Sequence, residues 1–363
     1  MAVNQKRWSK TPGEPWWSSA KTGSRGRSPH LSEILLPVRE YDLAVTLDSG
    51  QVFRWQKQND SWVGVIGKHR VRLTQTPAGI RAETASPVPD WNFLREFLQT
   101  DVDLGAVLKT FPDDVPMRAA VAACPGLRLL KQDPWECLAS FILSSTKQIV
   151  QIRQIVSLLC ERFGEPVVCP PLMGSTGLRP VVSGVAPETV GRCGQTLIRR
   201  DNPWRTISDE IRRDAGFDGR DARATHGKTF PTPQRLAAAT EAELRACKMG
   251  FRAPSLLAAA RDIAEGRFDL ERIRHLPHAE ARAELMKLRG VGGKIADCVL
   301  LFAYGFDSAF PVDVWIERAL QQLYFPRRRA SEQRLRRFAA THFGPHAGYA
   351  QQYLFHYIRT KMK

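Results

Sequence analysis

The sequence predicts an α+β fold in which an antiparallel sheet comes first and helices follow. Between Tyr41 and about Arg81, short runs rich in β-branched and aromatic residues alternate with polar residues, and turn sequences such as Asp-Ser-Gly separate them. After Pro89, apolar residues recur at spacings of three and four, the period of an amphipathic helix. Strands that precede the helices, rather than alternate with them, indicate the α+β class.

The expected elements follow from these patterns in chain order. Strands are expected at residues 43–47, 53–56, 62–66 and 71–74. Helical periodicity covers residues 91–99, 135–163, 253–265, 280–288, 293–304, 314–323, 331–342 and 348–360, with a further helix starting near Leu236.

Composition divides the chain into five parts. The first part is rich in Ser, Gly, Pro and basic residues, which is typical of a disordered arm. A central stretch with weak periodicity and many Pro, Gly and Arg residues is expected to be an insertion of low order. The expected boundaries are 1–30 for the basic arm, 31–130 for the sheet domain with trailing helices, 131–169 and 229–325 for a helical core, 170–228 for the insertion and 326–363 for C-terminal helices.

The charge balance favours a polyanionic partner. The 363 residues include 53 Lys and Arg against 37 Asp and Glu, a formal net charge of +16. The arm holds six of these bases and one acid, so the excess extends through the rest of the chain. Residues 327–337 alone carry six arginines, for which we expect non-specific contacts with phosphate, a solvated charged face being the alternative.

Neither a membrane protein nor a disulfide-rich secreted protein is predicted. No apolar run approaches the roughly 20 residues that span a bilayer, and the N-terminus lacks the apolar region of a secretory signal. We therefore expect an intracellular protein, in the cytoplasm or nucleoid of a bacterium or the nucleus of a eukaryote. The seven cysteines form no C-x-x-C pair, so neither a zinc site nor a disulfide framework is expected.

The most informative motif is a predicted helical hairpin at residues 285–298. An amphipathic helix is expected to end near Arg289, Gly290-Val291-Gly292 forms a tight turn, and a second helix begins at once. Backbone N–H groups at such a turn and helix N-terminus can bind a DNA phosphate without reading the base sequence.

Lys294 lies in the first turn of the second predicted helix. A lysine amine has a pKa of about 10.4 when unperturbed, so it is a poor nucleophile at neutral pH. The positive end of a helix and partial burial both disfavour the ammonium form, which is a route to an activated amine. Taken alone, the motif is equally compatible with a solvated lysine after an ordinary turn between helices.

A carboxylate follows the hairpin in the segment Ala309-Phe-Pro-Val-Asp313. Asp313 is expected to cap a helix, which is a common use of aspartate. A rigidly held carboxylate could also support positive charge on a sugar as a base departs. The hairpin, Lys294 and Asp313 together resemble the helix–hairpin–helix (HhH-GPD) superfamily of DNA glycosylases, in its lysine-bearing branch, whose catalytic lysine and aspartate fall on these two residues.

Further segments resemble the 8-oxoguanine DNA glycosylases, in a bacterial-like branch. The resemblance covers about residues 35–168 and 229–360, and implies a TBP-like sheet domain before the helical body. In that family the carbonyl of the glycine at Gly50 accepts a hydrogen bond from N7–H of the oxidised base, whereas normal guanine has an acceptor at N7. Gln351 would read the Watson–Crick edge of the flipped base, and Phe355 and Cys298 would cover its two faces.

The resemblance also implies a wedge into the duplex. Phe251 would fill the space beside the orphaned base and Arg252 would hydrogen-bond to it. Thr146 and Gln151 stand where eukaryotic members carry an asparagine and an arginine that hold the orphaned cytosine. Because an amide can donate or accept, whereas a guanidinium only donates, we expect weaker discrimination for cytosine opposite the lesion. Trp315 replaces a phosphate-contacting histidine.

The predicted activity is excision of 8-oxoguanine from duplex DNA, with cleavage of the abasic strand, by a monomer that needs no metal or organic cofactor. Two alternatives stay open. One is a lysine-bearing glycosylase for oxidised pyrimidines or mispaired adenine. The other is a non-catalytic helix–hairpin–helix module that binds DNA.

Overall fold

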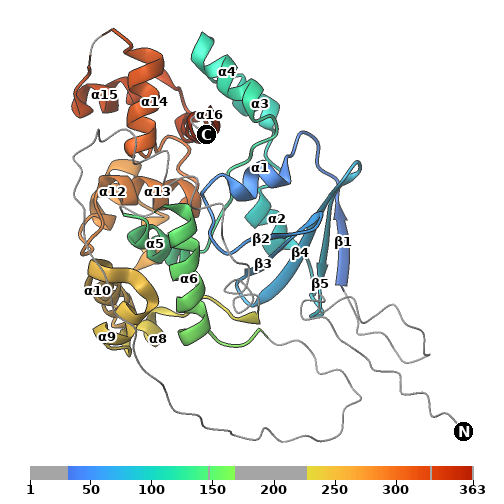
Figure 1. Ribbon diagram of the computed structural model, residues 1–363, viewed down its shortest axis with the longest axis vertical. Coiled ribbons are helices and arrows are strands. Elements are labelled where there is room, and N and C mark those ends of the chain that lie inside the picture. The colour runs from blue at the N-terminus through green and yellow to red at the C-terminus, as the bar shows by residue number, and fades with distance from the viewer. Residues whose placement is uncertain (1–31, 146–147, 168–226, 328, 362–363) are drawn as a thin grey trace, which may run out of the picture.

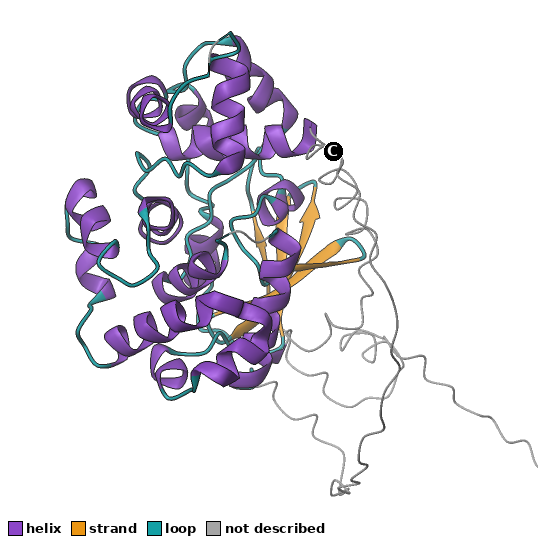
Figure 2. Cartoon of the chain, turned by 60° about the vertical axis from the view of Figure 1, so that its left-hand side comes forward, coloured by secondary structure: helices purple, strands orange, loops and turns teal. Residues whose placement is uncertain are grey.

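The computed structural model describes residues 32–145, 148–167, 227–327 and 329–361. Within these ranges the strands form one five-stranded antiparallel sheet in the order β1-β5-β4-β3-β2. The strands are β1 (Ser32–Leu36), β2 (Gln56–Gln58), β3 (Ser61–Ile66), β4 (His69–Thr76) and β5 (Gly79–Thr84). The sheet lies on one side of the molecule and the helical body on the other (Figure 1), and Figure 2 shows the helices grouped beside it. The α+β prediction is confirmed.

The sheet has its own apolar core. Trp62 of β3 pairs with Leu73 of β4, which pairs in turn with Ala82 of β5, and all three side chains are buried. They pack with Leu47 and Leu94 from the two helices α1 (Leu43–Asp48) and α2 (Asn92–Leu98). In β4 buried and more open positions alternate around Val71 and Leu73, as the period of two predicts, whereas β3 is buried on both faces from Ser61 to Val65.

The first predicted strand, at residues 43–47, is wrong, because this segment is the helix α1. Asp42 caps it by accepting a hydrogen bond from the amide of Val45 at 2.8 Å. Leu43, Thr46 and Leu47 are buried while Val45 is only partly so, which is the spacing of a helix face. Over five residues the apolar pattern fits both periods, and the cap decides between them. Strands β1 and β5 were not among the predicted elements, and the strand predicted at 53–56 begins only at Gln56.

The remaining helices form the larger body, whose core is continuous from Phe53 to Tyr357. They are α3 (Leu104–Leu108), α4 (Val115–Ala123), α5 (Pro134–Leu143), α6 (Ile149–Phe163), α8 (Pro233–Ala237), α9 (Glu241–Leu244), α10 (Ala253–Ala264), α11 (Leu270–Ile273), α12 (His278–Leu285), α13 (Gly293–Val299), α14 (Val314–Tyr324), α15 (Glu332–His342) and α16 (Ala347–Lys361).

Two predicted helices are interrupted. The helical pattern at residues 135–163 is divided into α5 and α6, because Ser144 ends α5 and its hydroxyl donates to the carbonyl of Phe141 at 2.8 Å. The pattern at 293–304 runs as α13 up to Val299 and then as a π-helical turn at Leu300–Tyr304. Both interruptions lie in segments that also supply the site described below.

A buried amide network joins the sheet unit to the helical body. Gln51, which has no exposed surface, donates to the carbonyl of Arg128 at 2.8 Å and accepts from the amide of Leu130 at 2.8 Å. The side-chain amide of Gln132 donates to the Gln51 carbonyl at 2.8 Å, and the backbone amide of Gln132 donates to the carbonyl of Phe302 at 2.7 Å. This network places the turn at residues 49–51 against the body.

The predicted arm at 1–30 and most of the predicted insertion at 170–228 lie outside the described residues. The predicted domain boundaries therefore stay predictions. Within the described ranges, none of the helices combines the length and apolar character needed to cross a bilayer.

Candidate active site

The predicted hairpin joins α12 to α13. Gly290 adopts a φ of +83°, which favours glycine, and a Cβ there would come within 2.6 Å of the Ser255 side chain on α10. Gly292 caps α13 and is exposed, and a Cβ there would meet nothing within 4 Å. The amide of Val291 already donates to the carbonyl of Leu288 at 3.1 Å, so it is not free for a phosphate in this conformation. The flanking glycines remain the predicted phosphate contacts.

A half-buried ion pair connects the two helices of this hairpin. Nε of Arg282 on α12 lies 2.6 Å from Oδ1 of Asp297 on α13, and the Asp297 carboxylate is buried. Burial raises the pKa of Asp297, and the hydrogen bond from Arg282 opposes that shift. The same guanidinium occupies the space into which a Cβ at Gly293 would project. The pair thus fixes the angle at which α13 leaves the hairpin.

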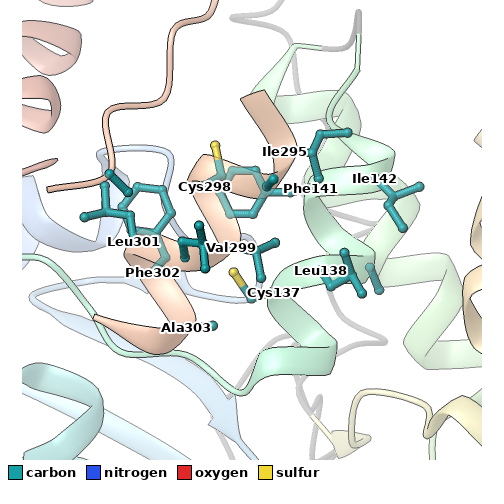
Figure 3. Close-up of a cluster of buried hydrophobic side chains, with 14 of the residues drawn as sticks. Cys137, Leu138, Phe141, Ile142, Ile295, Cys298, Val299, Leu301, Phe302 and Ala303 are labelled. Carbon is teal, nitrogen blue, oxygen red and sulfur yellow. The ribbon is translucent and has the colours of Figure 1, made fainter. Parts of the chain in front are cut away.

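Lys294 projects toward α5 and not into bulk solvent. Its Nζ donates to Oγ of Ser144 at 2.9 Å and lies 5.4 Å from the centre of the Phe141 ring. Phe141 stacks on Phe302 with ring centres 5.5 Å apart, and both rings are buried, so the amine meets a packed aromatic wall. Figure 3 shows α13 packed against α5 here, with Cys298 beside Phe141. The amine is therefore held at the edge of the core, half-buried, between a hydroxyl and an aromatic face.

Asp313 caps α14, as predicted. One oxygen, Oδ1, accepts hydrogen bonds from the amides of Trp315 and Ile316 at 3.0 and 2.9 Å. Burial raises the pKa of this carboxyl, and the two amides and the nearby charges of Lys294 and Arg359 oppose the shift. Because only one oxygen is used by the cap, the other is available for charge stabilisation within the electrostatic reach of Lys294.

Cys298 shares this environment but is not a nucleophile. Burial raises the pKa of its thiol to about 12, and the carboxylate of Asp313 acts in the same direction while Lys294 opposes it. The residue is 3% exposed and packs against the aromatic wall. It is a small apolar surface one helical turn beyond the amine, and a face of the base-binding slot stays its predicted role.

Gly50 and Phe355, which are far apart in the sequence, lie together. Gly50 follows α1 with a φ of +90°, and a Cβ there would come 3.3 Å from Cε1 of Phe355 and 2.7 Å from Ile149. The α16 helix is tied to the same turn, since the Gln352 amide donates to the Ser49 carbonyl at 3.1 Å. A residue larger than glycine would therefore clash with Ile149 and press against Phe355.

Gln351 has an unsatisfied acceptor. The side chain is 4% exposed, and within the described ranges its Oε1 has no hydrogen-bond partner. A buried amide without partners costs free energy unless a ligand completes it. Gln351 lies one helical turn before Phe355 on α16, so the open acceptor and the aromatic ring face the same side.

The predicted wedge residues lie in a separate segment between α9 and α10. The Phe251 ring is 67% exposed, which is unusual for a large apolar residue. Arg252 is 3% exposed and its guanidinium stacks 4.3 Å from the centre of that ring. Gln151 is exposed at the start of α6, where its side chain accepts from the amide of Gln148 at 3.3 Å. Thr146 lies outside the described residues.

Two residues of this site, Ser144 and Arg359, were not predicted from the sequence. The hydrogen bond from Lys294 to Ser144 spans 150 positions, so no local spacing in the sequence indicates it. The sequence does carry a signal for Arg359, whose charge acts on Asp313. Arg359 lies eight residues after Gln351 and four after Phe355, so all three share one face of the same helix.

Trp315, which replaces the phosphate-contacting histidine, is half-buried, and the guanidinium of Arg318 lies 5.4 Å from its ring centre.

Comparison with known proteins identifies two family domains in this chain. The sequence family defined by the 8-oxoguanine DNA glycosylase N-terminal domain matches residues 33–138, which hold the sheet and Gly50. The model of the HhH-GPD superfamily of base excision DNA repair proteins matches residues 200–344, which hold Lys294 and Asp313.

Relatives match along nearly the whole chain. A probable N-glycosylase/DNA lyase of Methanothermobacter thermautotrophicus is 29% identical, over 89% of this chain and 95% of its own length. The 8-oxoguanine glycosylase/lyase of Clostridium acetobutylicum, solved with double-stranded DNA containing cytosine opposite 8-oxoG, is 27% identical with a TM-score of 0.69, over 89% of this chain and 93% of that one. The structure of MBOgg1 with a low-affinity DNA ligand is 26% identical with a TM-score of 0.72, over 93% and 98%.

The fold and the lysine-bearing hairpin therefore define a helix–hairpin–helix protein of base excision DNA repair. Within that superfamily, the chain belongs to the 8-oxoguanine DNA glycosylases.

Proposed function

We propose that this protein excises 8-oxoguanine from duplex DNA with the amine of Lys294 and then cleaves the abasic strand with the same amine. The observation that best supports this is the placement of the Lys294 amine. Its Nζ lies 2.9 Å from Oγ of Ser144 and is close enough to the half-buried helix cap Asp313 to act on its charge. The enzyme is an N-glycosylase and DNA lyase, as the family and its relatives indicate. Its partner is double-stranded DNA.

Excision begins when the lesion leaves the base stack, which costs a few kcal/mol. The exposed Phe251 fills the gap, and Arg252 contacts the orphaned base after leaving its stacked position. The extruded base enters a slot bounded by Cys298 and Phe355, where N7–H donates to the Gly50 carbonyl. Gln351 meets the Watson–Crick edge, and this supplies the missing partner of its Oε1.

The chemistry then uses one amine twice. The neutral Lys294 amine attacks C1′ of the sugar, the bond from C1′ to N9 breaks, and its electron pair leaves with the base. The Asp313 carboxylate stabilises positive charge on the sugar during departure. Loss of the amine proton and opening of the sugar ring produce an imine. A proton lost from C2′ then drives elimination of the 3′ phosphate, and water releases Lys294.

Gln151 in place of arginine implies weaker preference for cytosine, which excision opposite each of the four bases would measure. We expect an intracellular monomer that works without a metal ion. The arginines at residues 327–337 would add non-specific phosphate contacts, although Arg336 is already paired with Glu332 at 2.9 Å.

Trapping of the imine with sodium cyanoborohydride tests the assignment. Incubation of the protein with an 8-oxoguanine duplex should yield a covalent adduct, and Lys294→Gln should abolish the adduct while duplex binding persists. Lys287→Gln is the matched control, because Lys287 is an exposed lysine on the same hairpin that pairs with Glu284. An adduct in Lys294→Gln equal to that of the wild type would contradict the proposal.

A further inference from the structure

Arg359 on α16 holds a charge that the mechanism above does not use. Its guanidinium lies 5.2 Å from the centre of the Phe355 ring. Its Nη1 lies 3.4 Å from the position that a Cβ on Gly50 would take. Arg359 thus stacks on Phe355 and lies next to Gly50, the two residues assigned to one side of the base-binding slot.

This guanidinium is poorly satisfied by the protein. Within the described ranges its hydrogen bonding is limited to the Ser49 carbonyl at 3.4 Å, and it forms no ion pair there. The nearest carboxylate on the same turn, Asp48, is paired with Arg153 at 2.7 Å. A guanidinium has five N–H donors, so most of those of Arg359 are left for a further acceptor.

The surroundings of Arg359 would favour an anionic or strongly polar acceptor. Burial lowers the pKa of Arg359, and the charges of Asp48, Arg153 and Asp313 act on it. Asp313 links this group to the lysine site, since each residue contributes to the pKa shift of the other. A partly desolvated arginine makes stronger hydrogen bonds to an acceptor than a solvated one does.

We propose that Arg359 is a specificity-determining residue that donates to an oxygen of the flipped nucleotide, either the C8 carbonyl of the lesion or the adjoining phosphate. This inference rests on the proposed function and adds to it a contact on the side of the base next to Gly50. The carbonyl at C8 neighbours N7–H, so a donor beside Gly50 lies where that oxygen would arrive. The phosphate has the same acceptor chemistry and is the second source.

The test compares Arg359→Met, which keeps the packing stem on Phe355, with Arg359→Lys, which keeps the charge. For each protein, three quantities are measured: single-turnover excision of 8-oxoguanine, affinity for a duplex with a tetrahydrofuran abasic analogue, and strand cleavage at a natural abasic site. Arg359→Met should lose at least about tenfold in excision, and Arg359→Lys should recover part of that loss. Unchanged affinity for the abasic analogue assigns the contact to the base carbonyl, and a parallel loss assigns it to the phosphate.

Two control variants separate recognition from other effects. Gln352→Met removes the shorter hydrogen bond to the same Ser49 carbonyl, so it reports what loosening of the turn does by itself. Arg153→Met removes an equal charge from the same neighbourhood. Excision by Arg359→Met within twofold of the wild type, or an equal loss in either control, would overturn the inference. A wild type that does not excise 8-oxoguanine would overturn the proposed function instead.

Discussion

At the scale of single residues, the demands on Asp313 conflict. Its cap on α14 and its role at the sugar both favour the carboxylate, while burial disfavours that form and raises the pKa above the usual 3.8. A group whose pKa is raised on folding contributes stability below its unfolded pKa and loses it as the pH rises through the folded value. The ionised Asp313 therefore costs stability at neutral pH.

Replacement of Asp313 by Asn should separate these effects. Asp313→Asn can still accept the two amide hydrogen bonds but has no charge to stabilise the departing base, so excision should fall on the order of 100-fold or more. Its melting temperature at pH 7 should equal or exceed that of the wild type, and any advantage should shrink as the pH falls toward 4. The measurements are single-turnover excision and thermal unfolding against pH.

Asp313→Ala provides the comparison, because it removes the cap as well and should cost about 1 kcal/mol of stability. In the wild type, the acid limb of the excision rate should lie above the usual aspartate pKa, since activity is lost as the pH falls through the raised value. Full excision by Asp313→Asn would show that the carboxylate charge is not needed.

At the scale of elements, the hairpin depends on glycine for two different reasons. Gly290 has a positive φ and lies against Ser255, so its role is to let the chain turn close to α10. Gly292 has an ordinary φ of −92° with open space beside it, so a side chain fits but would stand where a phosphate must approach. The two glycines can therefore be tested against each other.

Gly290→Ala should destabilise the protein, by about 1–3 kcal/mol for the strained backbone alone. Gly292→Ala should leave the unfolding midpoint nearly unchanged and weaken binding to duplex DNA severalfold. Chemical denaturation and a fluorescence binding assay with an undamaged duplex measure the two quantities. If Gly290→Ala unfolds like the wild type, the turn is less constrained than its geometry indicates.

At the scale of the whole molecule, the base-binding side depends on how the sheet unit docks on the helical body. Gln51 contributes to that contact from a fully buried position. It hydrogen-bonds to the backbone of Arg128 and Leu130, and its own carbonyl accepts from Gln132, whose backbone amide donates to Phe302 of the helical body. The carbonyl of Ser49, two residues before Gln51, accepts a hydrogen bond from the side-chain amide of Gln352 on α16. A shift between the two units would therefore move Gly50 away from Phe355.

Gln51→Ala should leave two buried backbone groups unpaired and cost about 3 kcal/mol of unfolding free energy. Because the change also frees the Gly50 turn, 8-oxoguanine excision should fall more than cleavage of a preformed abasic site. The control is Gln234→Ala, an exposed glutamine on α8, which should change neither. Equal loss of both activities would indicate general unfolding and not a displaced turn.

How well the sequence predicted each element depended on how local its signals are. The α13 helix and the cap of α14 are specified by Gly292 and Asp313 within a few residues, and both were predicted. The segment at 43–47 was misread, because five residues with two compatible periods cannot decide between strand and helix without the cap. The break at Ser144 was missed, because the apolar spacing continues on both sides of it.

By itself, the sequence determined the order of sheet and helices, the glycine turn of the hairpin and the residues able to supply an amine and a carboxylate. These are properties of short segments, where turn, cap and periodicity signals act within one or two helical turns. Only the tertiary structure decided that Ser144 meets Lys294, that Gly50 lies against Phe355 and that Arg359 lies beside both. Such contacts join segments up to about 300 positions apart, so they depend on how whole faces pack and leave no trace in local spacing.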